Sequence, residues 1–438
     1  MQEFLRETDF WKNHICEYLC SSVVNKEKIF LKLAIDFHSH SGYAGGVGQI
    51  ELTTVSKTMK LKGIDVFGTG DCIFPTRTEE LKHELTEVKE GLFALPKDSS
   101  KFLLQTEVIF STKLMHKRNK TIAHHIILFP NFESIYKMQL LMNNWGMKNT
   151  IGRPFITSDT QKELEDQLFE INNIHPLIEI IPAHIMTPDG IFGSKNDLDE
   201  LSEFYGNFLS KIKAIETGLS ADPQMLEKIP DLAELTFISN SDCHSAALNR
   251  IGREFTILDV DQVDYKSIIN AIRKNHVIMT AEFNPAEGKY YLTGHRADRK
   301  GHSHEIIFAD EIPTGLICPI CNKRMNLGVR ERCAQLQNNS IIPIPRKFMH
   351  LIPLIEVIAT SQNLKSITSK RVKKVFDVIM NIFPSEIALW QSDSIQVMLD
   401  KRIDQKTINQ ILAVQKGDFK FQPPGYDGTY GNLIVGDK

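Results

Sequence analysis

Short apolar runs alternate with longer helical patterns from about residue 31 to residue 283. The runs are rich in β-branched residues and are bounded by turn residues. Such alternation is typical of strands joined by crossover helices in a parallel sheet or barrel, so we expect an α/β fold here. The clearest runs are LKLAID, GIDVFGTGD, FLLQTEVIF, HHIILF, IEIIPAH, KAIETG and TFISNSDCH.

The pattern changes at about residue 284. A stretch rich in Gly, Lys, Tyr and Arg leads into CPICNKRMNLGVRERC, which is typical of a small metal-stabilised module. The segments LIPLIEVIA, VKKVFDVIMNIF and INQILAV then have helical spacing, before the Gly-rich end QPPGYDGTYG. We therefore expect four parts: a helical extension over residues 1–32, a catalytic barrel over 33–284, a zinc-binding-like module over 285–335, and a helical DNA-binding region with the PGYDGTYG tail over 336–438.

Composition excludes two classes of protein. With 438 residues and 42% hydrophobic content, the chain can bury one large core and a second, smaller unit. No apolar run approaches the length of a membrane span, and the seven cysteines are scattered apart from Cys318 and Cys321. We therefore expect a cytoplasmic protein in a reducing compartment rather than a membrane protein or a disulfide scaffold.

Net charge alone does not favour a nucleic-acid binder, because the formal charge is -3. DNA affinity would have to come from a local patch, and one stretch is basic: between Cys321 and Phe376 only Glu331 and Glu356 oppose the cations. Both a phosphate-contacting stripe and a solvated face remain open as interpretations. The basic residues are Lys323, Arg324, Arg330, Arg332, Arg346, Lys347, Lys365, Lys370, Arg371, Lys373 and Lys374.

Ionisable side chains follow the apolar runs of the predicted barrel. Alternate residues of a strand project to one face, so His38 and His40 aim at a common point, and Asp242 and His244 repeat this arrangement. A lone ionisable residue at a strand end is most often structural, but six strand ends that converge would be costly to desolvate unless cations neutralised them. The sequence therefore predicts one clustered metal site. The other candidate ligands are Asp71, Glu107, His124 and His184.

Competing mechanisms have no motif in the chain. It contains no nucleophile elbow with Ser-His-Asp order, no Walker loop and no dinucleotide fingerprint. Clustered divalent ions suit hydrolysis of phosphodiesters, because they neutralise charge that grows on the transferring phosphate.

The order HxH, Gly-Thr-Gly-Asp, strand Glu, His pair, PAH and SDxH resembles the motifs of the PHP superfamily of metal-dependent phosphoesterases. The resemblance implies a distorted (β/α)7 barrel with two or three divalent ions, either Zn, Mn or Mg. By motif position it implies these catalytic ligands of the first metal: His38, His40, Glu107 and Asp242. It implies a second metal held by Glu107, His124 and His184, with Glu107 as the bridge.

A third metal site is less complete. Asp71 and His244 remain for it, but the histidine that other members place just after HxH falls at about Gly46 here. His125 is expected outside the ligand set, although it is able to exchange roles with His124.

Further segments narrow the resemblance to the endonuclease Q family, from about residue 33 to the end. They include PAHIMTP, ETGLSADPQM, SNSDCHS, EFNPAEGKYY, CPIC with LGVRER, and PGYDGTYG. That family nicks DNA on the 5′ side of deaminated bases and abasic sites, so the resemblance implies a metal-dependent endonuclease with DNA as its partner. One alternative is a diverged PHP nuclease or phosphatase with another target, acting with a partner in defence against foreign nucleic acid. Another is a catalytically silent DNA-binding scaffold.

A nuclease that reads a damaged base needs a pocket for the extruded nucleotide near the barrel mouth. Four residues are candidates for substrate binding, and each has a structural alternative: Glu216, Arg153, Arg253 and Lys289. Asp222, Glu282 and Tyr290 lie in the same segments and are further candidates.

The zinc-binding-like module departs from the endonuclease Q pattern. Cys318 and Cys321 keep the knuckle spacing, but Tyr291 and Ala297 stand where the family has a His and a Cys. We expect one structural zinc on Cys318 and Cys321 with two replacement ligands, His295 and His302. His304 and Cys333 are further candidates, and a metal-free module held by its own core is the alternative.

Overall fold

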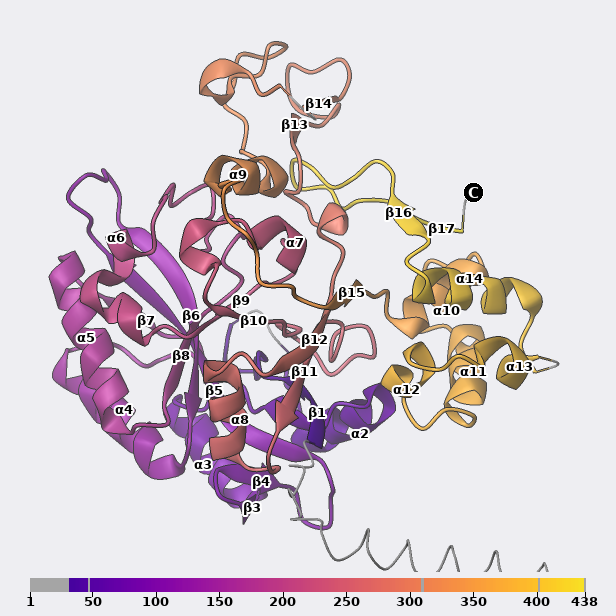
Figure 1. The fold of residues 1–438 in the computed structure, drawn as a ribbon, viewed down its shortest axis with the longest axis horizontal. Helices are drawn as coiled ribbons and strands as arrows, with labels where there is room; N and C mark the ends of the chain where they lie inside the picture. The colour runs from indigo at the N-terminus through magenta and orange to yellow at the C-terminus, as the bar shows by residue number, and fades with distance from the viewer. Residues whose placement is uncertain (1–30, 46–47, 309–310, 401, 437–438) are drawn as a thin grey trace, which may run out of the picture.

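The computed structural model describes residues 31–45, 48–308, 311–400 and 402–436. Figure 1 shows a barrel with its helices, a module above it that carries β13 and β14, and a group of helices to the right. The expected N-terminal helical extension lies outside the described residues, apart from Leu31 and Lys32, which begin strand β1.

The barrel is a ring of strands. Hydrogen-bonded neighbours run from β12 through β11, β1, β2, β5 and β6 to β8, and β9 pairs with β10. Strand β8 lies beside β9, and β10 lies beside β12, so the two sheets close the ring. In ring order the strands are β11 (Phe255–Val260), β1 (Leu31–Asp36), β2 (Val66–Gly68), β5 (Lys101–Thr112), β6 (Thr121–Phe129), β8 (Glu179–Pro182), β9 (Ala214–Glu216), β10 (Thr236–Ile238) and β12 (Val277–Glu282).

The ring is mixed rather than wholly parallel. Strands β1, β2 and β5 are parallel, whereas β6 is antiparallel to both β5 and β8, and β11 is antiparallel to both β1 and β12. The link between β5 and β6 is too short for a crossover helix, so these two strands form an antiparallel pair. This reversal decides which residues of β6 reach the site described below.

Helices and short strands surround the ring. Apolar side chains of the ring strands pack against the buried face of α8 (Tyr265–Arg273), and a larger apolar cluster continues through the outer helices. The other outer elements are α2 (Leu52–Lys62), α3 (Pro75–Glu84), β3 (Thr86–Lys89), β4 (Leu92–Ala94), α4 (Phe132–Asn144), β7 (Phe155–Thr157), α5 (Gln161–Ile174), α6 (Ser202–Tyr205) and α7 (Pro223–Leu226). No helix in the described part of the chain is long and apolar enough to cross a membrane.

The module and the helical region follow the ring. The module holds β13 (Thr293–His295), β14 (Ile306–Phe308) and α9 (Val329–Leu336), after which β15 (Phe348–His350) pairs with β12. The helical region and tail comprise α10 (Leu354–Ser361), α11 (Lys370–Met380), α12 (Glu386–Trp390), α13 (Ile395–Leu399), α14 (Gln405–Gln415), β16 (Phe419–Phe421) and β17 (Leu433–Val435).

The PGYDGTYG tail returns to the module rather than staying with the helices. The buried Asp427 carboxylate accepts hydrogen bonds from the Arg299 guanidinium and from the backbone amide of Arg296, at 2.9 Å. A Cβ at Gly425 would lie 2.0 Å from the carbonyl oxygen of Gly288, so glycine is required where the tail passes this segment. The tail therefore ties the module to the end of the chain.

A buried ion pair joins the helical region to the barrel. Lys62 of α2 lies 2.8 Å from Glu386 of α12, and both side chains are 3% exposed. Glu386 also accepts a hydrogen bond from the Leu354 amide, at the start of α10. Both contacts are made by Glu386 Oε1, so this one buried atom joins α2 to α12 and to the start of α10.

Candidate metal centre

The two strongest sequence motifs lie side by side. The segment that follows β1 and the segment that follows β10 form a parallel bridge at Ser39 and Cys243. His40 donates its amide to the Cys243 carbonyl at 3.1 Å, and Cys243 donates its amide to the His38 carbonyl at 3.3 Å. This register brings His38 and His40 next to Asp242, as the alternate spacing predicted.

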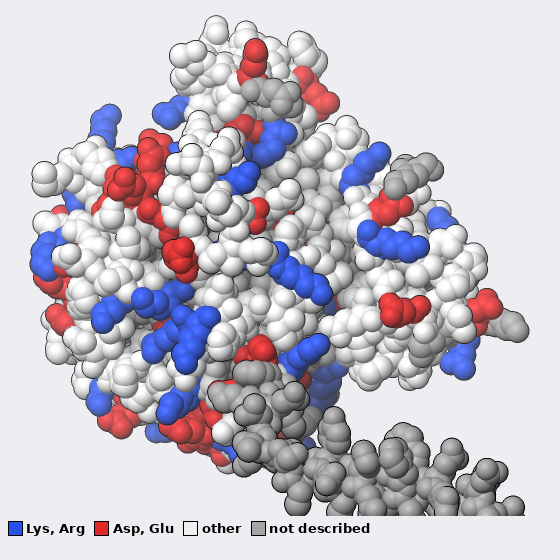
Figure 2. Space-filling model, viewed as in Figure 1, with Lys and Arg blue, Asp and Glu red and all other residues white. Residues whose placement is uncertain are grey.

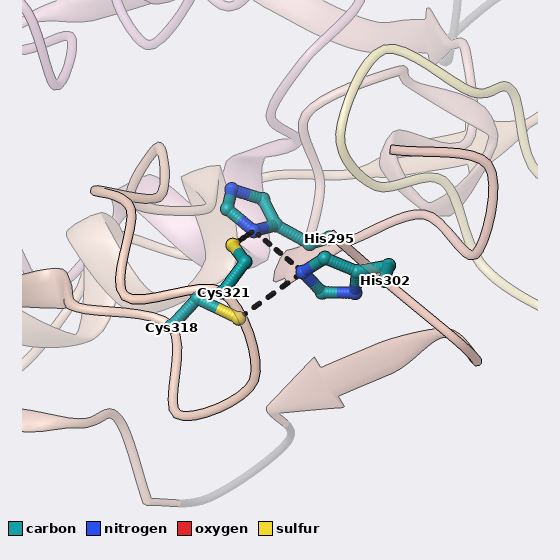
Figure 3. A group of neighbouring side chains, drawn as sticks. All are labelled: His295, His302, Cys318 and Cys321. Carbon is teal, nitrogen blue, oxygen red and sulfur yellow. Dashed lines mark hydrogen bonds between the residues drawn. The ribbon is translucent and has the colours of Figure 1, made fainter. Parts of the chain in front are cut away.

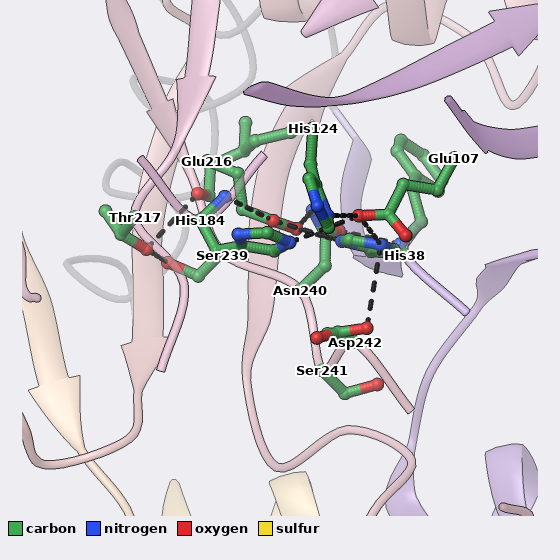
Figure 4. Close-up of polar contacts among 12 residues, drawn as sticks. His38, Glu107, His124, His184, Glu216, Thr217, Ser239, Asn240, Ser241 and Asp242 are labelled. Atoms are coloured by element: carbon green, nitrogen blue, oxygen red, sulfur yellow. Dashed lines mark hydrogen bonds and ion pairs between the residues drawn. The ribbon is translucent and has the colours of Figure 1, made fainter. Parts of the chain in front are cut away.

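Glu107 of β5 is the centre of the cluster (Figure 4). Its Oε1 lies 2.7 Å from His124 Nδ1 and 3.2 Å from His184 Nε2, and its Oε2 lies 3.2 Å from His40 Nε2. The carboxylate is fully buried. One carboxylate thus faces imidazoles on both of its oxygens, which is the geometry of a bridging ligand.

Strand direction brings His124 to the site. Because β6 runs antiparallel to β5, residues near its start lie beside the last residues of β5, and His124 pairs in register with Ile109. The sequence pattern had suggested that His124 follows its strand. The structure instead places His124 within β6. The neighbouring His125 points the other way, with Nε2 2.6 Å from the Tyr205 hydroxyl. Burial lowers the pKa of His125 to about 3, so this side chain stays neutral in the core.

Buried polar atoms meet without hydrogen bonds of acceptable geometry. Three such atoms have no hydrogen-bond partner among the described residues: His38 Nε2, His40 Nε2 and Asp242 Oδ1. Asp242 Oδ1 lies 3.6 Å from His38 Nε2 and 3.3 Å from His40 Nε2. Unsatisfied buried groups cost free energy unless a partner completes them. Two sets of three donor atoms lie within 4.8 Å of one another, so the residues fit divalent metal ions. The sets are His38, His40 and Asp242, and His38, Glu107 and His184.

Two buried carboxylates orient the paired histidines. Glu216 at the end of β9 accepts from His38 Nδ1 at 3.0 Å, and Asp71 after β2 lies 3.3 Å from His40 Nδ1. Each contact leaves Nε2 of the histidine directed at the cluster, as in the carboxylate–histidine arrangements that support bound metals. Glu216 also accepts the amide of His184 at 2.9 Å.

The positions of Glu216 and Asp71 differ from the sequence expectations. Glu216 was expected to contact substrate, but its side chain is fully buried beneath His38. Asp71 was expected as a ligand of a third metal, but its oxygens face His40 and the amide and hydroxyl of Ser41. Within the described residues Asp71 joins neither donor set, nor does His244, which lies 3.3 Å from Asp242.

The charges around the site favour cations. Burial alone would lower the pKa of His38, but the carboxylates of Glu216 and Asp242 outweigh it and raise that pKa to about 9. Burial would raise the pKa of Glu107, but hydrogen bonds from His124 and His184 hold it well below its usual range. Burial would likewise raise the pKa of Asp242, but the charge of His38 holds it well below its usual range. Glu107 and Asp242 are therefore ionised, and positive charge between them is stabilised.

Arg153 lies at the rim of the centre. Its Nη1 is 3.3 Å from Glu107 Oε2, and 30% of its side chain is exposed. Its loop packs tightly on the site, since a Cβ at Gly152 would lie 2.5 Å from Asp71 Cγ. Arg153 and Glu216 are the two predicted substrate contacts that the structure brings to the metal cluster, and of these only Arg153 is partly exposed.

The other predicted substrate contacts lie elsewhere. Arg253 is buried and donates from Nε to the Ser241 carbonyl at 2.9 Å, so it supports the turn that carries Asp242. Lys289 lies over the Tyr430 ring of the tail, at 4.7 Å from Nζ to the ring centre.

The three further candidates for substrate binding make contacts within the fold. Asp222 caps α7 and lies 3.0 Å from His350 Nε2. Glu282 is fully buried on Thr217 and Ser239, and burial raises its pKa to about 7. The Tyr290 carbonyl accepts the Val329 amide at the start of α9.

Sequence reasoning missed Asn240 as part of the site. Its Oδ1 accepts the amide of Phe37 at 2.6 Å, and its Nδ2 donates to Glu216 at 2.9 Å. Asn240, which follows β10, therefore connects the end of β1 to the end of β9 next to His38. In the sequence Asn240 stands out only because it lies two residues before Asp242. Asn is also common in turns, so this position does not identify it as a site residue.

A second donor cluster lies in the module (Figure 3). His302 Nε2 is 3.3 Å from Cys318 Sγ and 3.3 Å from His295 Nδ1, which is 3.5 Å from Cys321 Sγ. All four donor atoms lie within 4.8 Å of one another. Two thiols and two imidazoles are a donor set that suits tetrahedral zinc.

The remaining zinc candidates are outside this cluster. The His304 ring lies against the Ser303 hydroxyl on the exposed surface, and Cys333 is buried in α9 among apolar residues. The structure thus brings together the four residues that the sequence singled out for zinc.

Solved structures match more than nine-tenths of the chain. It superposes on the lesion-specific endonuclease PfuEndoQ from Pyrococcus furiosus with a TM-score of 0.78 and 27% identity, covering 92% of this chain and 96% of that one. A complex of Endonuclease Q with a 27-mer duplex substrate, which has an abasic lesion at the active site, gives 0.78 and 28%, covering 93% and 97%. These matches confirm the predicted α/β fold and the predicted resemblance to endonuclease Q.

Two curated relatives are described as uncharacterized proteins. YqxK of Bacillus subtilis is 25% identical over 423 residues, which are 92% of this chain and 99% of the relative. MJ0043 of Methanocaldococcus jannaschii is 31% identical over 237 residues, but the match spans only 29% of its length. No family model matches the chain.

Proposed function

Because the chain belongs with endonuclease Q, whose structures it matches along more than nine-tenths of both chains, we propose that it is a metal-dependent DNA endonuclease. We propose further that it hydrolyses the phosphodiester on the 5′ side of deaminated bases or abasic sites. The observation that carries the proposal is the cluster around Glu107, where unsatisfied buried donors from separate strands meet in a fold of this type.

The ligands are proposed as two overlapping sets. His38, His40 and Asp242 hold one ion, and Glu107 with His184 and His124 holds a second, with Glu107 reaching both. Bound there, divalent cations supply Lewis-acid stabilisation of the charge that builds on a phosphodiester during hydrolysis. Zn, Mn and Mg are all compatible with imidazole and carboxylate donors in such nucleases.

The chain's own residues prepare this site. Glu216 and Asp71 hold the Nδ1 atoms of the two paired histidines, so both rings present Nε2 to the ions. Arg153 places a guanidinium at the exposed rim, where it can hold a phosphate oxygen of the DNA strand. His244 is about half exposed and lies 3.3 Å from Asp242 Oδ1.

We propose that each part of the chain has its own role. The barrel, about residues 33–284, carries the chemistry, and one structural zinc on His295, His302, Cys318 and Cys321 stabilises the module over 285–335. The helical region and tail over 336–438 are proposed to hold the duplex.

A cleavage screen tests the function. Duplexes with inosine, uracil, an abasic site or no lesion are incubated with the full chain and Mn²⁺ or Mg²⁺, and products are sized on a denaturing gel. We expect a nick 5′ of the lesion, at a rate well above that for the undamaged duplex, and no nick after chelation. Intact lesion strands, or faster cleavage of undamaged DNA, RNA or a small phosphate ester, would instead support a diverged nuclease or phosphatase.

A further inference from the structure

The basic stretch of the sequence does not form one surface. Arg332 is buried and donates to the carbonyls of Phe192 and Leu198 in the barrel. Arg346 donates to backbone carbonyls, including that of Leu235, and stacks over the Phe237 ring at 3.8 Å. Figure 2 shows Lys and Arg scattered among Asp and Glu on the face in view. Affinity for a polyanion therefore needs a local concentration of free cations.

One pocket in the helical region has such a concentration. It has a volume of about 650 Å³ and lies where α10, α11 and α14 meet. Arg371 and Lys374 are three positions apart on α11 and so share a face, while Arg402 and Lys406 flank the start of α14 on the other wall. All four side chains are exposed.

The four cations are not neutralised by neighbours. Within the described chain none of the four forms an ion pair with a carboxylate, and Lys406 donates to the amide oxygen of Asn363. The only carboxylate in the lining is Asp404, so the lining carries four positive charges against one negative. Asp404 is already used as the cap of α14, where it accepts from the amide and hydroxyl of Thr407.

This local charge contrasts with the net charge of the chain, which is -3. Like charges held this close repel one another, and an anion between them relieves the repulsion. Arginine on each wall favours phosphate, because the guanidinium fork pairs with two phosphate oxygens.

The pocket is open and extends along α14. A neighbouring hollow of about 640 Å³ shares Lys406 and adds Lys416 further along the helix, with Asp418 as the one carboxylate among its described lining residues. An open, extended groove with cations along it suits a chain of phosphates better than a single small anion.

We infer that this pocket, lined by Arg371, Lys374, Arg402 and Lys406, binds the sugar–phosphate backbone of duplex DNA away from the cut site. The inference rests on the proposed function, because it takes the polyanion to be the DNA substrate. The pocket contributes affinity that does not depend on the lesion, since phosphates carry no base information.

Binding of undamaged and abasic duplexes is measured by fluorescence anisotropy over a series of salt concentrations, with the full-length protein. The double variant Arg371→Gln and Lys374→Gln should weaken binding of both duplexes by the same factor, roughly 10-fold at physiological salt. The slope of log affinity against log salt should become shallower by about 0.9 for each phosphate that the variant no longer neutralises.

The matched control lies on the same helix. Lys373→Gln removes one positive charge, against two in the double variant. Lys373 pairs with Asp377 of its own helix and does not line the pocket, so affinity and slope should stay unchanged. Lys406→Gln on α14 is a second pocket variant, which keeps the test independent of the folding of α11.

Three results would overturn the inference. Pocket variants that bind both duplexes with wild-type affinity and salt slope, while the wild type binds and cuts DNA, would refute the pocket alone. A wild type that binds no duplex would refute it together with the proposed function. Weaker binding of the abasic duplex only would mean that the pocket reads the lesion and not the backbone.

Discussion

Glu107→Gln is expected to lower strand cleavage by on the order of 10³-fold or more, because one buried carboxylate faces both proposed metal sets. The amide keeps the shape of the side chain but loses the charge that the imidazoles of His124 and His184 surround. Metal content measured on the purified variant should fall as well. Affinity for duplex DNA should change little, since binding depends on basic residues outside the cluster.

The control for this prediction is Glu133→Gln. Glu133 is an exposed residue whose ion pair with Lys137 lies on the surface of α4, where such pairs contribute little. It should keep wild-type cleavage and metal content. Equal loss of cleavage and of DNA affinity in Glu107→Gln would contradict the separation of chemistry from binding.

The double variant Cys318→Ser and Cys321→Ser is expected to lose one bound metal per chain and to loosen the module. The four donor atoms lie within 4.8 Å of one another, and two weak hydroxyl donors in place of two thiolates cannot hold zinc tightly. Zinc contributes on the order of 10 kcal/mol to the folding of isolated zinc-finger peptides, so amide hydrogen exchange over residues 285–335 should accelerate strongly. Exchange in the ring strands should stay close to wild type.

His304→Ala is the control variant, because His304 was an alternative candidate for a zinc ligand. His304 is close in sequence but lies outside the cluster, on the exposed Ser303 hydroxyl. It should therefore retain the metal and the protection of the module. Wild-type metal content in the cysteine variant would show that the module is held by its own core instead.

The paired motifs were predictable because their spacing is local. Alternation within a strand places His38 and His40 on one side, and the same rule applies to Asp242. The zinc donors were predictable for a similar reason, since Cys318 and Cys321 have knuckle spacing and histidines lie nearby.

Other roles depend on tertiary structure and so could not be read from the sequence. The apolar pattern alone does not say which of the neighbours His124 and His125 faces the ring interior, so that expectation came from motif position in the family resemblance. Glu216 sits at a strand end like a ligand, but the packing of β9 beneath His38 buries it and turns it toward that ring. The contact of Asp427 with the module spans more than 100 residues, and no local pattern reveals it.

The central claim is that residues from separate strands converge on Glu107 to hold clustered divalent ions. Anomalous diffraction from crystals soaked in Mn²⁺, recorded near the manganese edge, tests it most directly. We predict at least two peaks in contact with Glu107, one shared with His38, His40 and Asp242 and another with His184 and His124. If fully soaked crystals show no anomalous peak among these side chains, that result would contradict the metal centre and the enzymatic function that depends on it.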